Sequence, residues 1–499
     1  MNKISFVDTT LRDGQMSLWA TEMTTGMMLP VAETMDSAGF EAIEIIAAAF
    51  FKKAVRDLRE DPWERLRLIR QRIQKTPLRA IRGRYMTAFH ISPKAIEDLW
   101  MERLAAHGIR QIRISDSSNT VSVWGEHVRS AHQIGFDAIV NLIFSMSPKH
   151  TDEYYAQKTR AAAELGTERI CLKDPGALLT PERMQTLVPA VLQNANGIPV
   201  ELHTHCITGL GPLCCLEAIK LGIRSINTAI PPLSNGSSNP SLFNIIANAR
   251  ALGYTTNIDE ASLKAVEQHF TTIAQRGGLP IGKPMEYDSS HYIHQVPGGM
   301  ISNLRHQLST SGLAGKVDAV LEEIGKVRAD FGYPIMVTPY SQFVGVQATM
   351  NVVSGERYKQ VSDEVIQYAM GLWGEEECSS IIPDVRDRIL DRPRARELAH
   401  WQPPQPTLSD LRREYGGTGV TDDELLLRYF AGEDPVAAMH AAVRSTPDRN
   451  SQGGNGANTG NSVVHLIDEM SKHTKINYIQ VQKGASSLML QNSGNSAPS

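Results

Sequence analysis

The sequence predicts an α/β fold, a closed barrel of eight parallel strands and their helices, followed by a mostly helical C-terminal region. The first observation is that short β-favouring runs alternate with longer helical patterns from residue 3 to about residue 250. The second is that eight such runs fit into that length, which is usual for this barrel. The third is that no GxGxxG follows the first run, which disfavours the alternative of an open doubly wound sheet.

The predicted strands are runs rich in β-branched and aliphatic residues. Each run is flanked on both sides by polar residues. They cover residues 4–9, 40–46, 78–83, 109–115, 137–144, 169–173, 199–205 and 225–230. Two of the helices between them have clear start signals. Ser92-Pro93 and Thr180-Pro181 each place a capping side chain before a proline in the expected first turn.

The chain beyond the barrel is predicted to be mostly helical, with loops at residues 296–304 and 337–345 and an exposed connector at residues 383–405. The predicted domains are the barrel at residues 1–255, a helical region completing the active site at 256–445, a flexible linker at 446–462 and a small docking tail at 463–499. The tail suits an amphipathic helix and a hairpin with Lys483-Gly484 near its turn. We expect it to dock on this chain or another, because it is too small to hold a core; a frayed tail without a role is the alternative.

Composition excludes several classes of function. Lysine and arginine number 50 against 54 acidic residues, so the net charge of −4 provides no field to recruit nucleic acid or an anionic membrane. The five cysteines form no CxxC pair and no disulfide framework, which fits a reducing compartment. No leader or membrane-spanning run is evident, and a cytoplasmic location is expected.

Polar residues at the predicted strand ends indicate a metal site. Asp13 follows the first strand within Arg12-Asp13-Gly14, and His203 and His205 have the i, i+2 spacing that places two imidazoles on one face of a strand. Two imidazoles and a carboxylate can share one metal ion. The simpler interpretations are a solvated Asp-Gly turn and core histidines, but they do not explain why these groups end neighbouring strands.

Lys173 is unusual because it stands at a strand end inside the predicted barrel, where burying an ammonium group is costly. Either Asp174 pairs with it in a structural ion pair, or the amine has a chemical role.

Five motifs occur together in this order: DTTLRDGQMSLWAT, LKDPGALLTPE, ELHTH, VPGGMISNL and VTPYSQFVG. Over about residues 3–440 the chain resembles the carboxyltransferase domain of the pyruvate carboxylase, oxaloacetate decarboxylase and transcarboxylase family. The first motif alone also occurs in a wider group that includes isopropylmalate synthase and hydroxymethylglutaryl-CoA lyase. The resemblance implies a TIM barrel and a carboxyltransferase subunit of a multi-subunit biotin-dependent carboxylase. Such a subunit moves a carboxyl group between carboxybiotin and an enolisable small-molecule acceptor through a metal-stabilised enolate.

The resemblance also implies roles for individual residues. A divalent transition metal, Zn, Mn or Co, is held there by Asp13, Lys173, His203 and His205, with Lys173 carboxylated. Thr338 shuttles a proton between the acceptor and N1 of biotin, and Arg82 binds the acceptor's carboxylate. The positions that match the substrate site are Arg12, Gln15, Met16, Arg82, Phe89 and Cys206.

The chain departs from the family pattern at the substrate positions. The pyruvate-using members have RDAHQS where this chain has RDGQMS, so Gln15 and Met16 replace a histidine and a substrate-contacting glutamine. Phe89 lies near the usual substrate tyrosine, and Cys206 replaces the aspartate after HTH. Pyruvate is therefore not expected to be a good acceptor, because a methionine cannot replace the hydrogen bonds of a glutamine.

The partners follow from what the sequence lacks. It contains no Met-Lys motif of a biotin carrier and no biotin carboxylase region, so a separate biotin carboxyl carrier protein and biotin carboxylase subunit are expected, together with self-association into a homo-oligomer. Two alternatives stay open. One is a biotin-independent, metal-dependent carbon–carbon lyase or aldolase on the same barrel, and the other is an inactive scaffolding subunit of a carboxylase complex.

Overall fold

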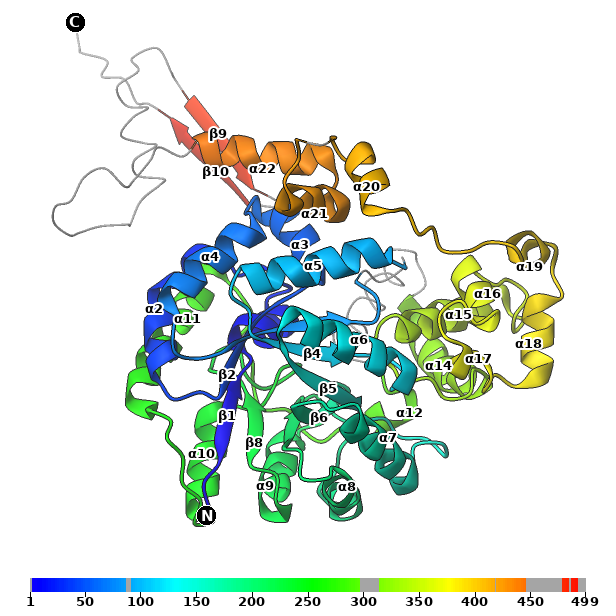
Figure 1. Cartoon of the computed structure of the whole chain (residues 1–499), viewed down its shortest axis with the longest axis horizontal. Helices are drawn as coiled ribbons and strands as arrows, with labels where there is room; N and C mark the ends of the chain where they lie inside the picture. Colours follow the sequence, from blue (N-terminus) through cyan, green and yellow to red (C-terminus); the bar gives the residue numbers. More distant parts are fainter. Residues whose placement is uncertain are drawn as a thin grey trace, which may run out of the picture. The chain divides into compact units, whose positions relative to one another are not determined.

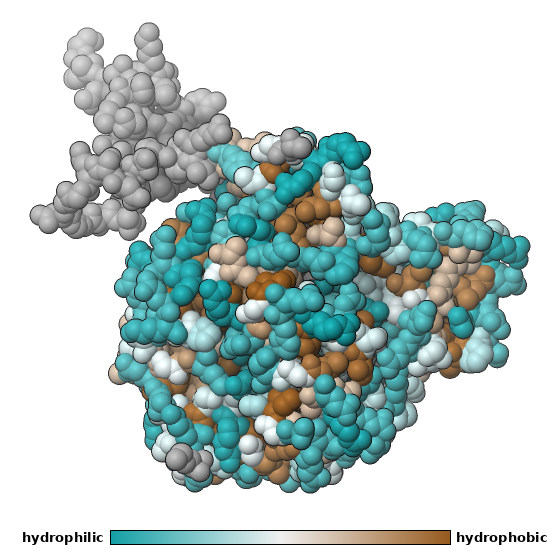
Figure 2. Space-filling view, in the orientation of Figure 1, coloured by the Kyte–Doolittle hydropathy of each residue, from teal (hydrophilic) through white to brown (hydrophobic). Residues whose placement is uncertain are grey.

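The computed structural model describes residues 2–86, 91–296, 314–417, 419–445, 478–483 and 486–491. The chain forms two compact units, residues 1–443 and residues 444–499. In the described part of the chain, no helix combines the length and the apolar character needed to cross a membrane. Figure 2 shows one face of the molecule, on which hydrophobic residues occupy separate small areas between hydrophilic ones.

The first unit is built on a closed barrel of eight parallel strands that follow one another around the barrel in chain order (Figure 1). The strands are β1 (Ser5–Asp8), β2 (Ala42–Ala47), β3 (Leu78–Gly83), β4 (Gln111–Ser115), β5 (Asp137–Ile143), β6 (Arg169–Asp174), β7 (Val200–Thr204) and β8 (Ser225–Thr228). Register pairs such as Asp8–Thr228 between β1 and β8 close the barrel. The predicted fold class and all eight predicted strands are confirmed.

Helices cover the outside of the barrel (Figure 1). They are α2 (Thr25–Ser37), α3 (Ala49–Lys53), α4 (Pro62–Arg72), α5 (Lys94–Ala106), α6 (Val121–Ile134), α7 (Asp152–Glu164), α8 (Pro181–Asn194), α9 (Gly211–Leu221), α10 (Leu242–Ala251) and α11 (Glu260–Gly277). The Thr180 hydroxyl caps α8 by accepting from the Arg183 N–H at 3.1 Å, as predicted. The cap predicted from Ser92-Pro93 is wrong, because Pro93 itself precedes the first residue of α5 and makes no side-chain cap.

The barrel interior contains paired charges as well as apolar side chains. Arg79 of β3 donates to Glu201 of β7 at 2.8 Å, and Arg113 of β4 donates to Glu44 of β2. All four side chains are fully buried. Alternate residues of each strand point inward, so these pairs fill the interior while the carboxyl ends of all eight strands open at one end of the barrel.

The region after α11 contributes to two separate cores. Residues 317–398, which we call the helical lobe, have their own core around the buried aromatic residues Tyr340, Phe343, Tyr368 and Trp373. Its helices are α14 (Val317–Asp330), α15 (Tyr340–Ser354), α16 (Asp363–Ala369), α17 (Glu375–Cys378), α18 (Pro383–Leu390) and α19 (Pro393–Leu398), with the short α12 (His291–His294) before it. Two loop predictions are therefore wrong in part: residues 340–345 begin α15, and residues 383–398 form two helices whose prolines occupy first turns.

Three final helices return to the barrel: α20 (Leu408–Glu414), α21 (Asp422–Ala431) and α22 (Glu433–Ser445). Phe430 of α21 packs against Phe51 of α3, with ring centroids 5.4 Å apart. The Arg56 Nε donates to the Ala431 carbonyl at 2.7 Å. These helices share the hydrophobic core of the barrel instead of the core of the helical lobe.

The second unit contains an antiparallel hairpin of β9 (Tyr478–Lys483) and β10 (Ser486–Gln491), in which Lys483 pairs with Ser486. The predicted hairpin is confirmed. The predicted linker at residues 446–462 and the predicted tail helix lie outside the described residues.

Asp423 provides a test of how α21 is held. Its carboxylate accepts from Arg103 Nε at 2.7 Å and from His107 Nε2 at 2.9 Å. Burial alone would raise the pKa of Asp423, but these two hydrogen bonds lower it below the usual range. We expect Asp423→Asn to reduce the free energy of unfolding at pH 7 by about 1–2 kcal/mol, because hydrogen bonds to a charged group are lost. Urea unfolding would measure this.

The pH dependence of that loss follows from the direction of the pKa shift. A carboxylate whose pKa is lowered by folding stabilises the protein above its unfolded pKa, near 4, and loses this effect as the pH falls through the folded value. The difference between Asp423→Asn and the parent protein should thus shrink below about pH 4. Asp384→Asn, at an exposed position of α18, is the control. Equal unfolding curves for all three proteins at pH 7 would contradict the assignment.

Candidate active site

Three donor atoms converge at the carboxyl end of the barrel. Asp13 lies in a single π-helical turn, η1 (Thr10–Gly14), directly after β1, while His203 lies near the end of β7 and His205 follows that strand. The Asp13 Oδ2 lies 2.9 Å from His203 Nε2 and 3.2 Å from His205 Nε2, and the two Nε2 atoms are 3.2 Å apart. All three residues are buried. The structure therefore brings three of the predicted residues into one small triangle.

The triangle has the dimensions of a metal-binding site. Ligand atoms bound about 2.1 Å from one ion lie about 3.0–3.4 Å from each other, so these three atoms match one face of a coordination shell. Two imidazole nitrogens with a carboxylate oxygen form a donor set that suits Zn, Mn or Co.

Asp13 and Gly14 do not form the solvated Asp-Gly turn of the simpler interpretation. Gly14 has helical dihedrals, with φ −56°, and leads into the short helix α1 (Gln15–Leu18). A Cβ on Gly14 would lie only 2.7 Å from the Leu233 carbonyl oxygen. Glycine is needed here because another segment approaches the backbone closely, and this contact fixes the direction of Asp13.

A hydrogen bond orients His203. Its Nδ1 lies 3.1 Å from the Asn227 Oδ1, which also accepts from Arg113 Nη1 at 3.1 Å. Because that oxygen only accepts, the proton is assigned to Nδ1 and the lone pair of Nε2 points at Asp13 and His205. Burial lowers the pKa of His203 to about 3, and the charge of Arg113 acts in the same direction. His203 is therefore neutral at physiological pH, as a metal ligand must be.

Arginine side chains balance the carboxylates around the triangle. Arg12 donates to Asp13 Oδ2 at 3.0 Å and to Glu44 Oε2 at 2.7 Å, and the Ser17 hydroxyl donates to Asp13 Oδ1 at 3.0 Å. Burial opposes ionisation of Asp13, but Arg12 and His205 hold its pKa well below the usual range. Asp13 is an anion at pH 7, and Arg12 is engaged by protein carboxylates.

Lys173 lies beside the triangle in the barrel. It pairs in register with His203 on the neighbouring strand, so both side chains leave the sheet on the same side. Asp174 is not its partner: that carboxylate accepts from the backbone N–H groups of Leu178 and Leu179 and from the Thr204 hydroxyl. Burial lowers the pKa of Lys173 to about 8, and the charges of Arg113 and Arg12 add to this effect. A fraction of the Lys173 side chains is therefore a neutral amine near physiological pH.

The remaining predicted substrate residues are placed differently. Arg82 lies three residues after the inward-pointing Arg79 and therefore points outward, where it donates to Glu97 of α5 at 2.8 Å. Gln15 is buried and donates to the Leu11 carbonyl, whereas Met16 is 38% exposed. Cys206 is buried, and burial raises the pKa of its thiol. Phe89 lies outside the described residues.

Thr338 is held at the barrel opening by its backbone. The Ser117 hydroxyl, just beyond β4, donates to the Thr338 carbonyl at 2.7 Å, while the Thr338 side chain is exposed. Around this contact, Ser118 donates to the Tyr340 hydroxyl at 2.9 Å and Tyr340 donates to the Trp373 carbonyl at 2.8 Å. The helical lobe is thus joined to the loop after β4 by a chain of polar contacts.

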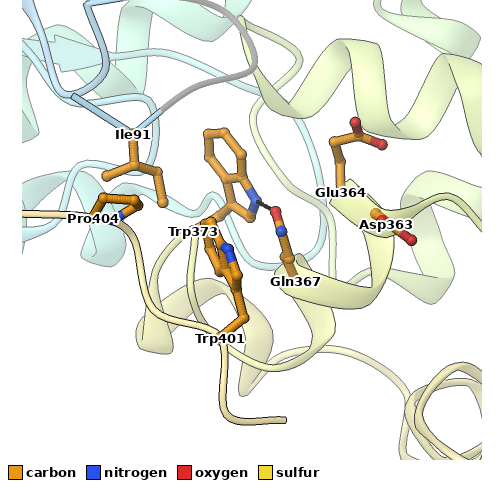
Figure 3. Close-up of a pocket in the computed structure, with 7 residues that line it drawn as sticks. All are labelled: Ile91, Asp363, Glu364, Gln367, Trp373, Trp401 and Pro404. Atoms are coloured by element: carbon orange, nitrogen blue, oxygen red, sulfur yellow. Dashed lines mark hydrogen bonds between the residues drawn. The ribbon is translucent and has the colours of Figure 1, made fainter. Parts of the chain in front are cut away.

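A separate pocket with a volume of about 200 Å³ lies at the edge of the helical lobe, where residues outside the lobe complete its lining (Figure 3). Its lining residues are Ile91, Asp363, Glu364, Gln367, Trp373, Trp401 and Pro404. Gln367 Oε1 accepts from Trp373 Nε1 at 3.3 Å, and the carboxylates of Asp363 and Glu364 point away from the indole rings. It contains none of the residues around the triangle, so we do not assign the chemistry to it.

The residues that support the triangle were not predicted from the sequence. Glu44, Arg113, Asn141 and Asn227 are buried polar residues inside the barrel. Glu44, Arg113 and Asn141 each stand between two apolar residues of a strand, which was the available signal, whereas Asn227 is followed by the polar Thr228.

Two segments of the chain match known protein families. Residues 3–269 match the family described as HMGL-like, and residues 292–436 match the conserved carboxylase domain. The chain is 36% identical over 451 residues to a pyruvate carboxylase subunit of Methanocaldococcus jannaschii, covering 89% of this chain and 79% of that protein. It is 32% identical to the 2-oxoglutarate carboxylase large subunit of Hydrogenobacter thermophilus, over 75% of this chain and 58% of that protein.

The fold has close counterparts among solved structures. A variant of the carboxyl transferase domain of Rhizobium etli pyruvate carboxylase, solved with pyruvate, superposes with a TM-score of 0.80. The match covers 89% of this chain and 78% of that one at 23% sequence identity, a level at which it supports the fold alone.

Metal titration tests the triangle directly. We expect His205→Ala to weaken binding of Zn, Mn or Co by about 100-fold or more, because it removes one of three converging donors, and Asn227→Ala to weaken it by about 10–100-fold through the loss of His203 orientation. Calorimetric titration of the metal-depleted protein would give both values. His132→Ala, at a half-exposed site on α6, is the control. Unchanged affinity in His205→Ala would exclude the triangle as the binding site.

Proposed function

We propose, from the premise that this chain belongs to the carboxyltransferase family of pyruvate carboxylase, oxaloacetate decarboxylase and transcarboxylase, that the triangle of Asp13, His203 and His205 is the metal centre of its transfer reaction. The reaction moves a carboxyl group between carboxybiotin on a separate carrier protein and a small-molecule acceptor. The observation that carries the proposal is the convergence of three buried donor atoms at the carboxyl end of the barrel.

Lys173 would complete this donor set as a carbamate. Its neutral amine forms a bond to the carbon of CO2 and releases a proton, which converts a cation into an anionic oxygen ligand. The register pairing with His203 and the neighbouring charges of Arg12 and Arg113 support this assignment, because an anion is stabilised where an ammonium is disfavoured. A divalent transition metal held by these four residues would supply a Lewis acid for the acceptor's carbonyl oxygen.

Thr338 would carry the proton. As the carboxyl group leaves N1 of biotin for the acceptor carbon, that nitrogen must gain a proton and the carbon must lose one. The exposed hydroxyl of Thr338, on a backbone anchored by Ser117, is suited to accept one proton and donate the other. Arg82 would require a different side-chain orientation to bind an acceptor carboxylate, because Glu97 engages it here.

The proposed partners are a biotin carboxyl carrier protein and a biotin carboxylase, in the cytoplasm. The match to relatives that are named as single subunits of carboxylases supports this arrangement. The tail at residues 463–499, which contains the β9–β10 hairpin, is proposed to dock such a partner, since it belongs to the second compact unit of the chain.

A biotin-independent lyase is the second candidate, because the HMGL-like match covers the barrel. It leaves the conserved carboxylase domain at residues 292–436 without a role. For this reason we favour transfer from carboxybiotin.

Reconstitution separates the two functions. With metal, ATP, bicarbonate and an acceptor, the purified chain should show no turnover until a biotinylated carrier and a biotin carboxylase are added, and avidin should abolish the reaction. Thr338→Ala should reduce transfer by about 100-fold or more while the metal stays bound, because general acid–base catalysis is lost. Lys173→Arg should also be inactive, since a guanidinium forms no carbamate. Avidin-insensitive turnover that tolerates Thr338→Ala would indicate the lyase.

The acceptor provides a further test. We expect pyruvate to be a poor acceptor, because Met16 cannot hydrogen-bond as the family's glutamine does, and Met16→Gln should raise kcat/KM for pyruvate by about 10-fold or more. Steady-state assays of both proteins with pyruvate and longer 2-oxo acids would measure this. If the parent protein uses pyruvate efficiently and Met16→Gln changes nothing, position 16 does not select the acceptor.

A further inference from the structure

The β4–α6 loop, residues 116–120 with the sequence DSSNT, consists of polar residues, and four of the five are buried. Buried polar side chains need hydrogen-bond partners, and each side chain of this loop has one. Three of these partners belong to the helical lobe, one lies at the end of β5 and one lies within the loop. The loop therefore connects the barrel to the lobe.

Asn119 fixes the loop to the barrel. Its Nδ2 donates to the Ile143 carbonyl and its Oδ1 accepts from the Ile143 N–H, both at 2.8 Å. These two bonds resemble the pairing of a neighbouring strand, and they occur where the backbone pairing of β4 with β5 has already ended, at Val140. Asn119 also has a φ of +57°, which asparagine adopts more readily than most residues. Asparagine thus suits both the backbone and the contact at this position.

The end of β5 lies next to the candidate metal site. Ile143 pairs in register with Lys173 of β6, and the following residue, Phe144, donates its N–H to the Lys173 carbonyl at 2.7 Å. Lys173 pairs in turn with His203 of β7. The loop is therefore bound to the same group of strand ends that carries the proposed metal ligands, and its position is fixed relative to them.

The other side of the loop holds the start of α15. The Ser117 hydroxyl donates to the Thr338 carbonyl at 2.7 Å, and the Ser118 hydroxyl donates to the Tyr340 hydroxyl at 2.9 Å. These contacts hold the two residues on either side of Pro339. Because the Thr338 side chain is exposed, the barrel determines its position through this backbone contact.

A cluster of charged side chains stabilises the two ends of the loop. Asp116 Oδ2 accepts from the Thr120 N–H at 2.6 Å, and Asp116 Oδ1 accepts from Arg84 Nη1 at 3.3 Å. The Thr120 hydroxyl donates to Glu377 Oε1 of α17 at 3.2 Å, and Glu377 Oε2 lies 3.8 Å from Arg84 Nη1. The first and last residues of the loop are thus bound to each other and to the lobe.

We propose that Ser117 and Asn119 are positioning residues for carboxyl transfer, which together set the place of the Thr338 hydroxyl relative to the metal centre. The inference rests on the proposed function for the role of Thr338, and it adds the residues through which that hydroxyl is placed. Ser117 holds the lobe and Asn119 holds the barrel, so loss of either releases one side of the link. A proton shuttle must reach both reactants, and a displacement of about 1 Å can lower a rate by about 100-fold.

A double-mutant cycle with Thr338 tests the proposal. Ser117→Ala and Asn119→Gly, which still allows a positive φ, are assayed as zinc-loaded proteins with biotinylated carrier, biotin carboxylase and either pyruvate or 2-oxoglutarate. We expect kcat to fall by about 10–100-fold in each, while the KM for the 2-oxo acid and the zinc affinity change by no more than about threefold. Unchanged kcat in both variants would overturn the proposal.

The same substitutions in a Thr338→Ala background separate positioning from a general structural effect. Neither should lower kcat by more than about a further twofold there, because no hydroxyl is left to be placed. Losses that multiply in the double variants would overturn the proposal. If Asn119→Gly fails to fold, the cycle of Ser117→Ala with Thr338→Ala decides.

Glu376→Gln is the matched control. Glu376 of α17 accepts from Lys158 of α7 at 2.9 Å, a contact between the lobe and the barrel that does not involve the β4–α6 loop. This variant should keep kcat within about twofold of the parent value, because loss of a partly exposed ion pair has a small effect. A loss in Glu376→Gln as large as that in Ser117→Ala would show that any weakening of the lobe contact has the same effect, and would contradict a specific role for Ser117.

Hydrogen–deuterium exchange tests the link without turnover. The backbone amides at residues 340–343 should exchange at least about threefold faster in Ser117→Ala than in the parent protein, whereas Glu376→Gln should match the parent. Equal exchange in Ser117→Ala and the parent would overturn the proposal. Failure of the proposed function would look different: the parent protein would show no carrier-dependent transfer, although exchange responds to Ser117→Ala as expected.

Discussion

The structure depends on holding three electron-rich atoms, two imidazole nitrogens and a carboxylate oxygen, within 3.2 Å of one another in a buried site. Without a shared cation such a cluster is unfavourable, since its lone pairs face each other away from water. The surrounding network makes the arrangement possible: Asn227 sets the tautomer of His203, and Arg113 and Glu44 hold each other inside the barrel. Arg12 then links Asp13 to Glu44, so the interior charges form one connected system.

The helical lobe adds groups that the barrel lacks. The barrel supplies the donor triangle and Lys173, whereas the lobe places Thr338 and Arg328 over the loops after β4 and β5. Both contacts use backbone carbonyls or serine hydroxyls, which fix position without adding charge. Residues 292–436, which match the conserved carboxylase domain, therefore include a lobe with its own core that contacts the loops after β4 and β5 of the barrel.

Much of the barrel was predictable, because period-two apolar runs and turn residues specify strands locally. The family assignment from five motifs is confirmed by the matches to both domains. The triangle was predictable from residue types, because parallel strands of one barrel end together. The orientation of Arg82 was not, since one residue of register decides between the interior and α5. Proline-rich residues 383–398 were misjudged as a connector because proline also begins helices.

The most direct test of the central claim, a metal centre completed by a carboxylated lysine, is ¹³C NMR of zinc-loaded protein equilibrated with ¹³C-bicarbonate. The account predicts one carbamate carbonyl resonance that is bound to the protein, depends on zinc and is absent from Lys173→Arg. A zinc-loaded parent protein without this resonance, or a resonance that persists in Lys173→Arg, would contradict it.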